Sequence, residues 1–392
     1  MKSVEELELK DRRVFLRVDF NVPLAENGEI RDDTRVRASL PTIRYLLGEG
    51  AKLVVASHLG RPKGKKDPKL SLAPVARLLG GLVPNKVIMA PDVVGDEVTR
   101  LKRELKAGEL LLLENVRYYK EEEGNDPAFS KKLAEDIDIF VNDAFGSSHR
   151  VHASVVGIAA FVPVKAAGFL MKEEVDQLRQ AIDAPERPYV AILGGAKVSD
   201  KIEVIQSLLA KADAVLIGGA MAYTFLKAQG QDVGRSLAED DQKDTALSIL
   251  RTARERKVDL WLPVDHVLAT ATDAAGAAST VPAPPFPPDL MGVDIGPRTV
   301  DAYARLIASA RTIFWNGPLG VFENPAFAHG TVKIAEAVAA SCAVSIVGGG
   351  DSIAALKQAG VTDRITHIST GGGASLEFIA YGTLPGIDAL EK

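Results

Sequence analysis

Basic and amide side chains follow four predicted strands in the first half of the sequence, the apolar runs 14–18, 52–57, 109–114 and 138–142. In open parallel sheets, ligands bind beyond the carboxyl ends of the strands. An arginine fork can pair bidentately with phosphate or carboxylate. We therefore expect a small-anion site here, although an exposed salt bridge is the simpler interpretation of any one arginine. The residues beyond the strands are Asp19, Asn21, Arg35, His58, Leu59, Gly60, Arg61, Asn115, Arg117, Asp143, His149 and Arg150.

Glycine-rich turns follow the predicted strands of the second half. The runs 189–193, 214–217 and 343–347 lead into Gly194-Gly195, Gly218-Gly219 and the stretch 348–352, and each turn precedes a predicted helix. Glycine lets the backbone approach a ligand closely, and helix N-termini attract phosphates. Tight strand-to-helix turns are the alternative reading of each glycine pair. Three such turns near Lys197 and Lys201 favour a nucleotide platform.

Two acidic residues of the second half have open roles. Asp351 precedes a predicted helix, where a carboxylate is most often a cap. At a polyphosphate site the same carboxylate would repel the ligand unless a cation such as Mg²⁺ lay between them. The residue's position leaves both readings open. Glu323 could accept hydrogen bonds from a ribose, but taken alone it reads more simply as a surface residue.

Two common nucleotide signatures do not fit this sequence. No segment matches GxxxxGK[ST], so a Walker-type phosphate loop is excluded. No GxGxxG follows a predicted strand within a convincing dinucleotide unit, which weakens the interpretation as a dehydrogenase.

Short apolar runs alternate with helical patterns throughout, which is typical of parallel βαβ architecture. At 392 residues the chain is long enough for two domains. The amphipathic stretch 169–182 predicts a helix between two sheets, closed by Pro185 and Pro188. We expect an α/β fold with two Rossmann-like domains, each a parallel β-sheet flanked by helices, joined by a hinge helix. The proline-rich segment 281–288 is expected to be a surface loop, and no function is assigned to 271–288.

Composition excludes several classes of protein. Cys342 is the only cysteine, so intrachain disulfides and cysteine-based metal sites are excluded and a reducing compartment fits. The N-terminal residues contain no apolar signal region, and the most apolar stretch, 155–164, is too short to span a bilayer. With a net charge of −5 and little basic excess in the first half, no nucleic-acid partner is expected. We expect a cytoplasmic protein without membrane partners.

Several long motifs resemble the signatures of the phosphoglycerate kinase family, in the family's order and over almost the whole chain. They are RVDFNVP (17–23), SHLGRP (57–62), LLLENVRYY (111–119), NDAFGSSHR (142–150), LGGAKVSDKI (193–202), WNGPLGVFE (315–323), GGGDS (348–352) and STGGGASLE (369–377). Ser352 stands where many members have threonine, and its hydroxyl role should survive.

The resemblance implies roles for individual residues. In the first domain, it implies 3-phosphoglycerate binding by Asp19, Asn21, Arg35, His58, Leu59, Gly60, Arg61, Arg117 and Arg150. In the second, it implies nucleotide binding by Gly194, Gly195, Lys197, Lys201, Gly218, Gly219, Gly292, Asn316, Glu323, Gly349, Gly350, Asp351 and Ser352. Asp351 is the implied metal ligand, and Arg35, Lys197, Gly350 and Gly373 form the implied catalytic set.

The predicted helix places the domain junction, and the resemblance implies that the last residues return to the first domain. Residues 1–168 together with 372–392 are expected to form the phosphoglycerate-binding domain and 185–371 the nucleotide-binding domain, with 169–184 as the helix between them. A monomer is expected, although the sequence itself does not determine the oligomeric state.

The implied reaction is the reversible, Mg²⁺-dependent conversion of 1,3-bisphosphoglycerate and ADP into 3-phosphoglycerate and ATP, a step of glycolysis. Both nucleophiles are ionised near pH 7, so no general base is needed. With substrate and nucleotide on different domains, transfer should require domain closure around the helix 169–182. Two alternatives stay open: a Rossmann-type oxidoreductase, and a non-catalytic metabolite-binding protein on the same fold.

Overall fold

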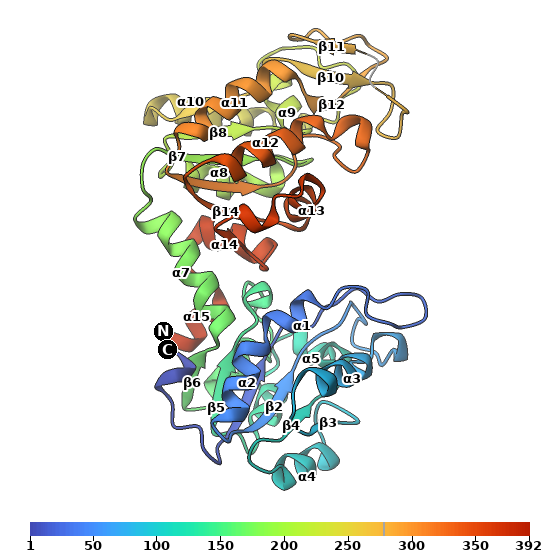
Figure 1. Ribbon diagram of the computed structural model, residues 1–392, viewed down its shortest axis with the longest axis vertical. Helices are drawn as coiled ribbons and strands as arrows, with labels where there is room; N and C mark the ends of the chain where they lie inside the picture. The colour runs from blue at the N-terminus through green and yellow to red at the C-terminus, as the bar shows by residue number, and fades with distance from the viewer. Residues whose placement is uncertain (277–278) are drawn as a thin grey trace. The chain divides into compact units, whose positions relative to one another are not determined.

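The computed structural model describes residues 1–276 and 279–392, so two residues of the segment 271–288 lie outside it. The chain divides into two compact units. Unit 1 comprises Met1–Asp176 and Thr383–Lys392, and unit 2 comprises Gln177–Gly382 (Figure 1). The helix expected at 169–182 is α7 (Phe169–Asp183), and the division falls within it.

Unit 1 contains a six-stranded parallel sheet of order β3-β4-β2-β1-β5-β6. Arg17, at the end of β1, is in register with Ala56 at the end of β2 and with Asn142 at the end of β5. The loops that follow these strands therefore leave from one edge. The strands are β1 (Arg13–Arg17), β2 (Lys52–Ala56), β3 (Val87–Met89), β4 (Leu110–Leu112), β5 (Ile139–Asn142) and β6 (Val164–Ala167).

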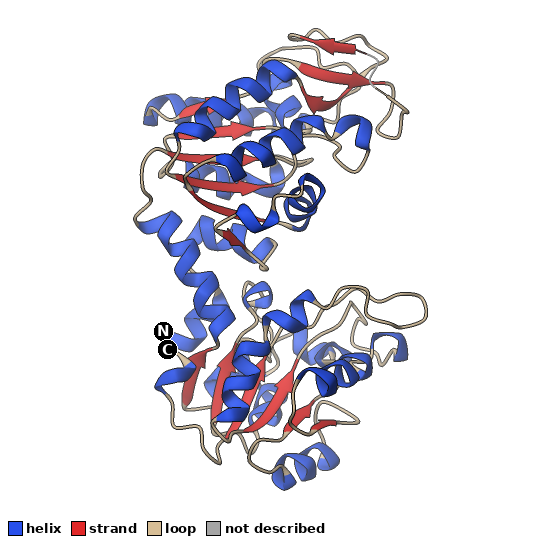
Figure 2. Cartoon of the chain, viewed as in Figure 1, coloured by secondary structure: helices blue, strands red, loops and turns tan. Residues whose placement is uncertain are grey.

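Helices flank this sheet (Figure 2). Local sequence explains their ends: Asp126 caps α6 by accepting from Phe129 N at 2.8 Å, and Pro127 occupies its first position. Acidic residues open α4 and basic residues close it, which complements the helix dipole. The helices are α1 (Thr34–Ala38), α2 (Leu40–Gly48), α3 (Ala73–Leu82), α4 (Asp96–Glu104), α5 (Lys120–Glu123), α6 (Pro127–Ala134) and α15 (Pro385–Glu391).

The last residues of the chain complete unit 1. Gly386 N donates to Ser148 O at 2.8 Å, and the Met1 amino group lies 3.5 Å from the Glu391 carboxylate. A Cβ at Gly386 would lie 2.7 Å from Ser148 Oγ, so α15 packs tightly on the loop that carries Arg150. Helix α14 (Gly373–Tyr381) instead belongs to unit 2, where Ser207 Oγ donates to Ile379 O at 2.8 Å. The predicted domain boundary at residue 372 therefore differs from the boundary of the compact units, which lies between Gly382 and Thr383.

Unit 2 contains a second six-stranded parallel sheet, of order β15-β14-β13-β7-β8-β9, with a core that includes Ile192, Trp315 and Tyr303. Its strands are β7 (Tyr189–Leu193), β8 (Ala214–Ile217), β9 (Asp259–Trp261), β13 (Thr312–Asn316), β14 (Val344–Gly348) and β15 (His367–Ile368). Its other helices are α8 (Ile202–Leu208), α9 (Met221–Ala228), α10 (Lys243–Arg256), α11 (Pro297–Ser309), α12 (His329–Ala340) and α13 (Gly350–Ala359).

A three-stranded antiparallel sheet, β11-β10-β12, also belongs to unit 2 (Figure 1). Its strands are β10 (His266–Ala269), β11 (Ser279–Val281) and β12 (Met291–Ile295). The proline-rich segment 281–288 follows β11, but it is not entirely a surface loop, because Phe286 is buried and packs against Tyr223 and His266.

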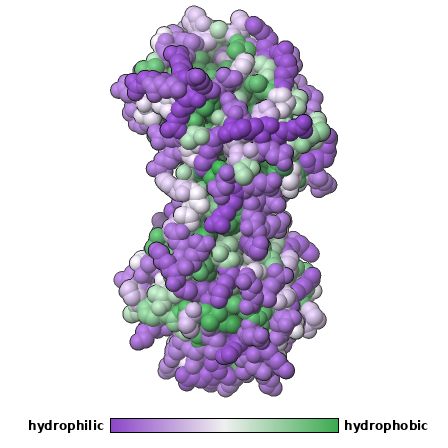
Figure 3. Space-filling model, turned by 90° about the vertical axis from the view of Figure 1, so that its left-hand side faces the viewer, coloured by the Kyte–Doolittle hydropathy of each residue, from purple (hydrophilic) through white to green (hydrophobic). Residues whose placement is uncertain are grey.

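The fold-class prediction of an α/β protein with two parallel sheets flanked by helices is confirmed. No helix among residues 1–276 and 279–392 is long and apolar enough to cross a membrane. Polar and charged side chains cover most of the face shown in Figure 3.

Candidate functional site

The loop after β1 begins the anion site of unit 1. Asp19 Oδ2 accepts from Arg35 Nη1 at 2.7 Å, and Asp19 Oδ1 accepts from Asn21 N at 3.1 Å. Burial alone would raise the pKa of the Asp19 carboxyl, but its interactions with His58, Arg35 and Arg17 hold it below its ordinary value. Asp19 therefore stays ionised and orients Arg35, whose side chain is 40% exposed.

Two amide side chains join the neighbouring loops to this one. Asn21 Oδ1 accepts from Gly60 N at 2.9 Å, which connects the loops after β1 and β2. Asn115 is fully buried, and it accepts from Leu59 N at 3.2 Å while donating to Leu59 O at 2.7 Å. Arg117 Nη1 donates to Gly60 O at 3.0 Å. Residues from the ends of β1, β2 and β4 thus form one hydrogen-bonded group, as the sequence predicted.

The remaining predicted residues of unit 1 differ in their environment. Arg61 and Arg150 are exposed, and their side chains have no partner among the residues that the structure describes. His149 is neutral near pH 7, because burial and the charge of Arg150 lower its pKa to about 4. Asp143 lies elsewhere: it is buried and accepts from Met171 N at 3.1 Å, at the start of α7.

In unit 2 a cavity of about 1060 Å³ opens beside the glycine turns; we call it the glycine cavity. It contains five of the predicted nucleotide residues: Gly195, Gly219, Gly292, Glu323 and Asp351. Its volume suits a ligand of nucleotide size, and its walls combine apolar side chains with a few polar groups.

The glycine turns are required by close approaches of the backbone. Gly195 N donates to Pro318 O at 2.9 Å, and Gly219 N donates to Leu319 O at 2.9 Å. A Cβ at Gly194 would lie 2.0 Å from Pro318 O, and a Cβ at Gly218 would lie 2.4 Å from the Leu319 side chain. These glycines hold the turns after β7 and β8 against the segment 317–319, of which Pro318 and Leu319 form part of the cavity wall.

Three predicted nucleotide-site residues support this wall through hydrogen bonds. Lys201 is buried and donates to the Asn316 backbone oxygen at 3.2 Å and to its side-chain oxygen. Asn316 Nδ2 donates to Gly348 O at 2.8 Å, and Ser352 Oγ accepts from Gly317 N at 2.6 Å. Burial lowers the pKa of Lys201 to about 8, against the opposing charges of Asp200 and Asp351.

Lys197 differs from Lys201 because its side chain is exposed and has no partner within the described part of the chain. Its cation is therefore available to a ligand. Gly350 and Gly373 begin α13 and α14, and a Cβ on either would meet open space. Gly349 has φ +95°, which suits glycine, and stands at the N-cap of α13.

Asp351 does not act as the helix cap. Gly349 holds the N-cap position of α13, and no side-chain cap hydrogen bond is present there. The Asp351 side chain is exposed and lines the cavity. The described residues contain no group of three His, Cys, Asp or Glu side chains that could hold a metal alone. A single carboxylate suits Mg²⁺, which typically binds one or two carboxylates with phosphates and water.

Sequence reasoning missed several residues of these sites. Tyr223 and Asp294 line the glycine cavity, and Gly292 approaches so closely that its Cβ would lie 1.9 Å from the Tyr223 hydroxyl. In unit 1, Arg17 was assigned only to a strand, although a charged residue within an apolar run could have indicated an interior ion pair.

Comparison with known proteins places the chain in a family. The sequence model described as phosphoglycerate kinase matches residues 4–381. A phosphoglycerate kinase of Anaeromyxobacter dehalogenans is 55% identical over 394 residues, with complete coverage of both chains. That of Acidobacterium capsulatum is 56% identical over 399 residues, covering 100% of this chain and 99% of the relative.

Two solved structures of phosphoglycerate kinases have the same fold. The Coxiella burnetii protein superposes with a TM-score of 0.89 at 43% identity, covering 99% of this chain and 98% of that one. The Pyrococcus horikoshii protein has a TM-score of 0.81 at 36% identity, covering 100% and 98%. These full-length matches support neither an oxidoreductase nor a non-catalytic binding protein.

Proposed function

This chain belongs to the phosphoglycerate kinase family and is therefore a phosphotransferase, and we propose that it transfers a phosphoryl group reversibly from 1,3-bisphosphoglycerate to ADP, giving 3-phosphoglycerate and ATP. The observation that carries the proposal is the combination of a hydrogen-bonded cation group in unit 1 with a nucleotide-sized glycine cavity in unit 2.

The anion site of unit 1 would take the phosphoglycerate. Arg61 and Arg150 present exposed guanidinium groups and Arg35 a partly exposed one, and these can pair with phosphate and carboxylate oxygens. Asp19 and Asn21 hold Arg35 and Gly60 in place, while Asn115 fixes Leu59. A set of preoriented cations suits a small substrate that carries several negative charges.

The glycine cavity would take the nucleotide. The backbone of Gly195 and Gly219, together with Gly292, leaves room for a planar base and ribose, and Glu323 is exposed in the wall as an acceptor for hydroxyl groups. Lys197 and the N-terminal turn of α13 (Gly350–Ala359) would face the phosphates, because a free ammonium and helix N–H groups both attract anions.

Asp351 would hold Mg²⁺ together with phosphate oxygens of the nucleotide. When bound, Mg²⁺ neutralises phosphate charge and supplies electrostatic stabilisation for the transfer. The single exposed carboxylate and the lack of a cap hydrogen bond at α13 support this assignment.

The protein's own residues supply alignment and positive charge. The attacking oxygens, a nucleotide phosphate in one direction and a carboxylate in the other, are ionised near pH 7, so a general base is not required. Arg35 and Lys197 would neutralise charge that develops on the transferred group, and the backbone N–H groups of Gly350 and Gly373 would donate to its oxygens. Hinge closure between the units stays a prediction, as do the cytoplasmic location, the monomeric state and the lack of nucleic-acid partners.

A coupled assay with 3-phosphoglycerate, ATP and Mg²⁺ tests the reaction, and absence of turnover in the purified protein would overturn it. Asp351→Asn tests the metal assignment, because the amide keeps the size of the side chain and loses its charge. We expect a higher Mg²⁺ requirement with an unchanged KM for 3-phosphoglycerate. Asp363→Asn, at an exposed site in the turn after α13, is the control. Identical Mg²⁺ curves for Asp351→Asn and wild type would contradict the metal role.

A further inference from the structure

Arg17 is a charged residue in the interior of unit 1. It ends β1, the strand between β2 and β5, and only 1% of it is exposed. Its guanidinium donates through Nε to Ser154 Oγ at 2.8 Å and through Nη1 to the backbone oxygen of Val18. The other terminal nitrogen of the guanidinium, Nη2, lies 3.2 Å from His58 Nδ1. Such burial leaves Arg17 almost no surface with which to contact a substrate.

A buried carboxylate balances this charge. Glu122 is fully buried, and its two oxygens accept from Ser154 N at 2.9 Å and from Ser154 Oγ at 2.6 Å. The Ser154 hydroxyl has one proton, which it gives to Glu122, so its oxygen lone pair is free to accept from Arg17. The serine thus links the two charges. The hydrogen bonds from Nε and Nη1 hold the Arg17 guanidinium in position.

The position of Arg17 determines the protonation of His58. A guanidinium has only donors, so His58 Nδ1 must be the acceptor in this contact and cannot carry a proton. The proton of the neutral ring then resides on Nε2. His58 is itself 95% buried, with 5% of the residue exposed.

The other charged groups that act on His58 agree with a neutral ring. Burial lowers the pKa of His58 well below its ordinary value, and the guanidinium groups of Arg17, Arg117 and Arg35 lower it further. The Asp19 carboxylate opposes them and raises it. His58 therefore supplies the anion site with no positive charge, unlike the arginines around it.

We propose that Arg17 is a positioning residue that holds His58 in the tautomer protonated on Nε2, so that His58 offers the substrate a neutral hydrogen-bond donor. The proposal rests on the assignment of the anion site to phosphoglycerate. A neutral N–H group forms a directional hydrogen bond with an acceptor oxygen. The positive charges of the arginines, in contrast, attract any anion. His58 then selects among anionic ligands, and the surrounding arginines supply the affinity.

Nitrogen NMR of the full-length protein labelled with ¹⁵N-histidine tests the tautomer directly, because a protonated and an unprotonated ring nitrogen resonate far apart. His58→Gln identifies the His58 signals. In the wild type we expect a proton on Nε2, a bare Nδ1, and no titration between pH 5 and pH 8. A proton on Nδ1, or a titration near the ordinary histidine pKa, would overturn the proposal without any Arg17 variant.

Arg17→Met with Glu122→Gln tests the role of Arg17 while removing both buried charges together. In this double variant we expect His58 to begin titrating above pH 5. We also expect the KM for 3-phosphoglycerate to rise by about tenfold and to become dependent on pH, with a smaller change in kcat. Arg17→Lys, which keeps a donor, should restore the bare Nδ1. If His58 in the double variant keeps its tautomer and stays untitrated, Arg17 does not position it.

Arg13→Met is the matched control, because Arg13 begins the same strand and donates at the opposite end of it, to Asp136 O at 3.3 Å. Its effect on the His58 signals should be nil. The two hypotheses fail in different ways: lack of turnover with the expected tautomer would refute the reaction, and turnover with a titrating His58 would refute the role of Arg17.

Discussion

The anion site of unit 1 and the glycine cavity of unit 2 are built from different parts of the chain. In unit 1, side chains form the site: Arg35 donates to the Asp19 carboxylate, His58 contacts the Arg17 guanidinium, and Arg117 donates to the Gly60 carbonyl. In unit 2, the backbone forms the wall, and Gly194 and Gly218 allow it to pack against 317–319. A side chain can be removed without moving the fold, whereas an added methyl group at a packed glycine cannot be accommodated without a shift.

The largest expected effect is on turnover in unit 1. We expect Arg35→Met to lower kcat by about 100- to 1000-fold, the range for losing one preorganised donor to a developing charge. The free energy of unfolding should change by less than about 1 kcal/mol, because the Arg35–Asp19 pair is partly exposed. Steady-state kinetics and thermal unfolding measure the two quantities.

Arg37→Met is the control for Arg35→Met. Arg37 lies two residues along the same helix and pairs with Asp33 at 2.9 Å, away from Asp19. We expect this variant to keep wild-type turnover. Activity of Arg35→Met within threefold of wild type would refute its assignment to the reaction.

The second effect is on stability in unit 2. Gly194→Ala places a Cβ 2.0 Å from Pro318 O, so the turns after β7 and β13 must separate. We expect a loss of about 1–3 kcal/mol, as for other overpacked sites, with weaker nucleotide binding. Gly80→Ala in α3 meets open space and should stabilise the protein slightly, because alanine favours a helix over glycine. Equal melting temperatures for the two variants would contradict this difference.

A smaller effect concerns the pH dependence of stability in unit 2, which we attribute to the buried side chain of Lys201. Its folded pKa of about 8 lies below the unfolded value of 10.5, so the unfolded chain binds more protons between these values. Stability should therefore increase with pH, by about 1 kcal/mol from pH 7.5 to pH 9. Denaturant unfolding of Lys201→Met should lack this increase. The same pH dependence in both proteins would show that another group titrates there.

The smallest effect concerns the lysines beside the anion site. Lys63 and Lys65 are exposed, with no side-chain partner in the described ranges, on a loop anchored where Gly64 N donates to Arg117 O at 3.2 Å. Fixed cations near a site raise the local concentration of an anion. Lys63→Gln with Lys65→Gln should raise the KM for 3-phosphoglycerate about two- to threefold at low salt, and less at high salt.

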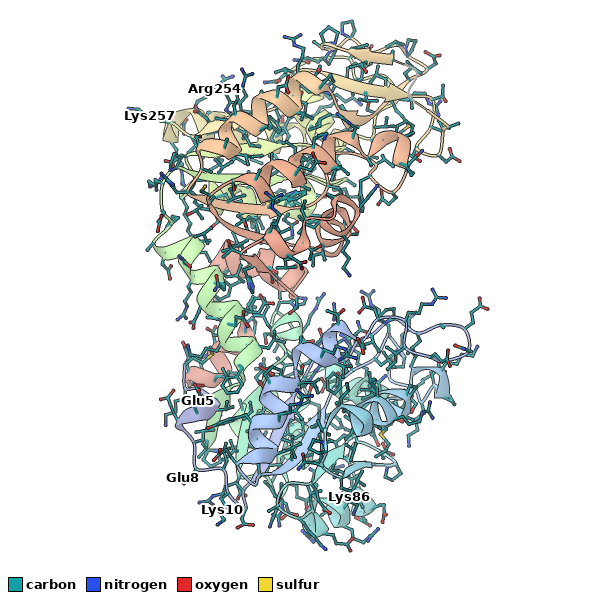
Figure 4. The ribbon with its side chains drawn as sticks, viewed as in Figure 1. Glu5, Glu8, Lys10, Lys86, Arg254 and Lys257 are labelled. Atoms are coloured by element: carbon teal, nitrogen blue, oxygen red, sulfur yellow. The ribbon has the colours of Figure 1, made fainter. Side chains whose placement is uncertain are left out.

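Lys10→Gln is the control for this pair, because Lys10 is exposed and precedes β1, at the other end of the sheet (Figure 4). It should leave the KM unchanged at every salt concentration. A shift in KM that does not depend on salt would indicate contact with the substrate instead of long-range attraction.

Much of the anion site could be predicted from the sequence because most of its residues lie in the segments that follow apolar strands. Parallel strands end at one edge, so Asn21, Gly60 and Arg117 had to come together. The role of Arg17 could not be read in this way. Its partner Ser154 is 137 residues away, and only the packing of the sheet reveals that the two meet.

The cavity of unit 2 was harder to predict for a related reason. Phe286 comes from a proline-rich stretch that resembles a surface loop, yet it packs on Tyr223 from α9 and on His266 from β10. The position of Asp351 left its role open between a cap and a metal ligand, because carboxylates are common at helix starts. The backbone instead places Gly349 at the cap, and no local pattern distinguished two positions so close together.

The return of the chain to unit 1 has a consequence for its synthesis. Gly386 packs against Ser148, and the segment Thr383–Lys392 belongs to the unit that begins at Met1. These ten residues follow the whole of unit 2 in the chain and are translated after it. Domains commonly fold in order while the ribosome is still at work, but here the first unit lacks its final helix until the whole of the second has been made. The contacts around Ser148, two residues from Arg150, therefore form only after unit 2 has been translated. Unit 1, although it begins the chain, is thus the second of the two units to be completed.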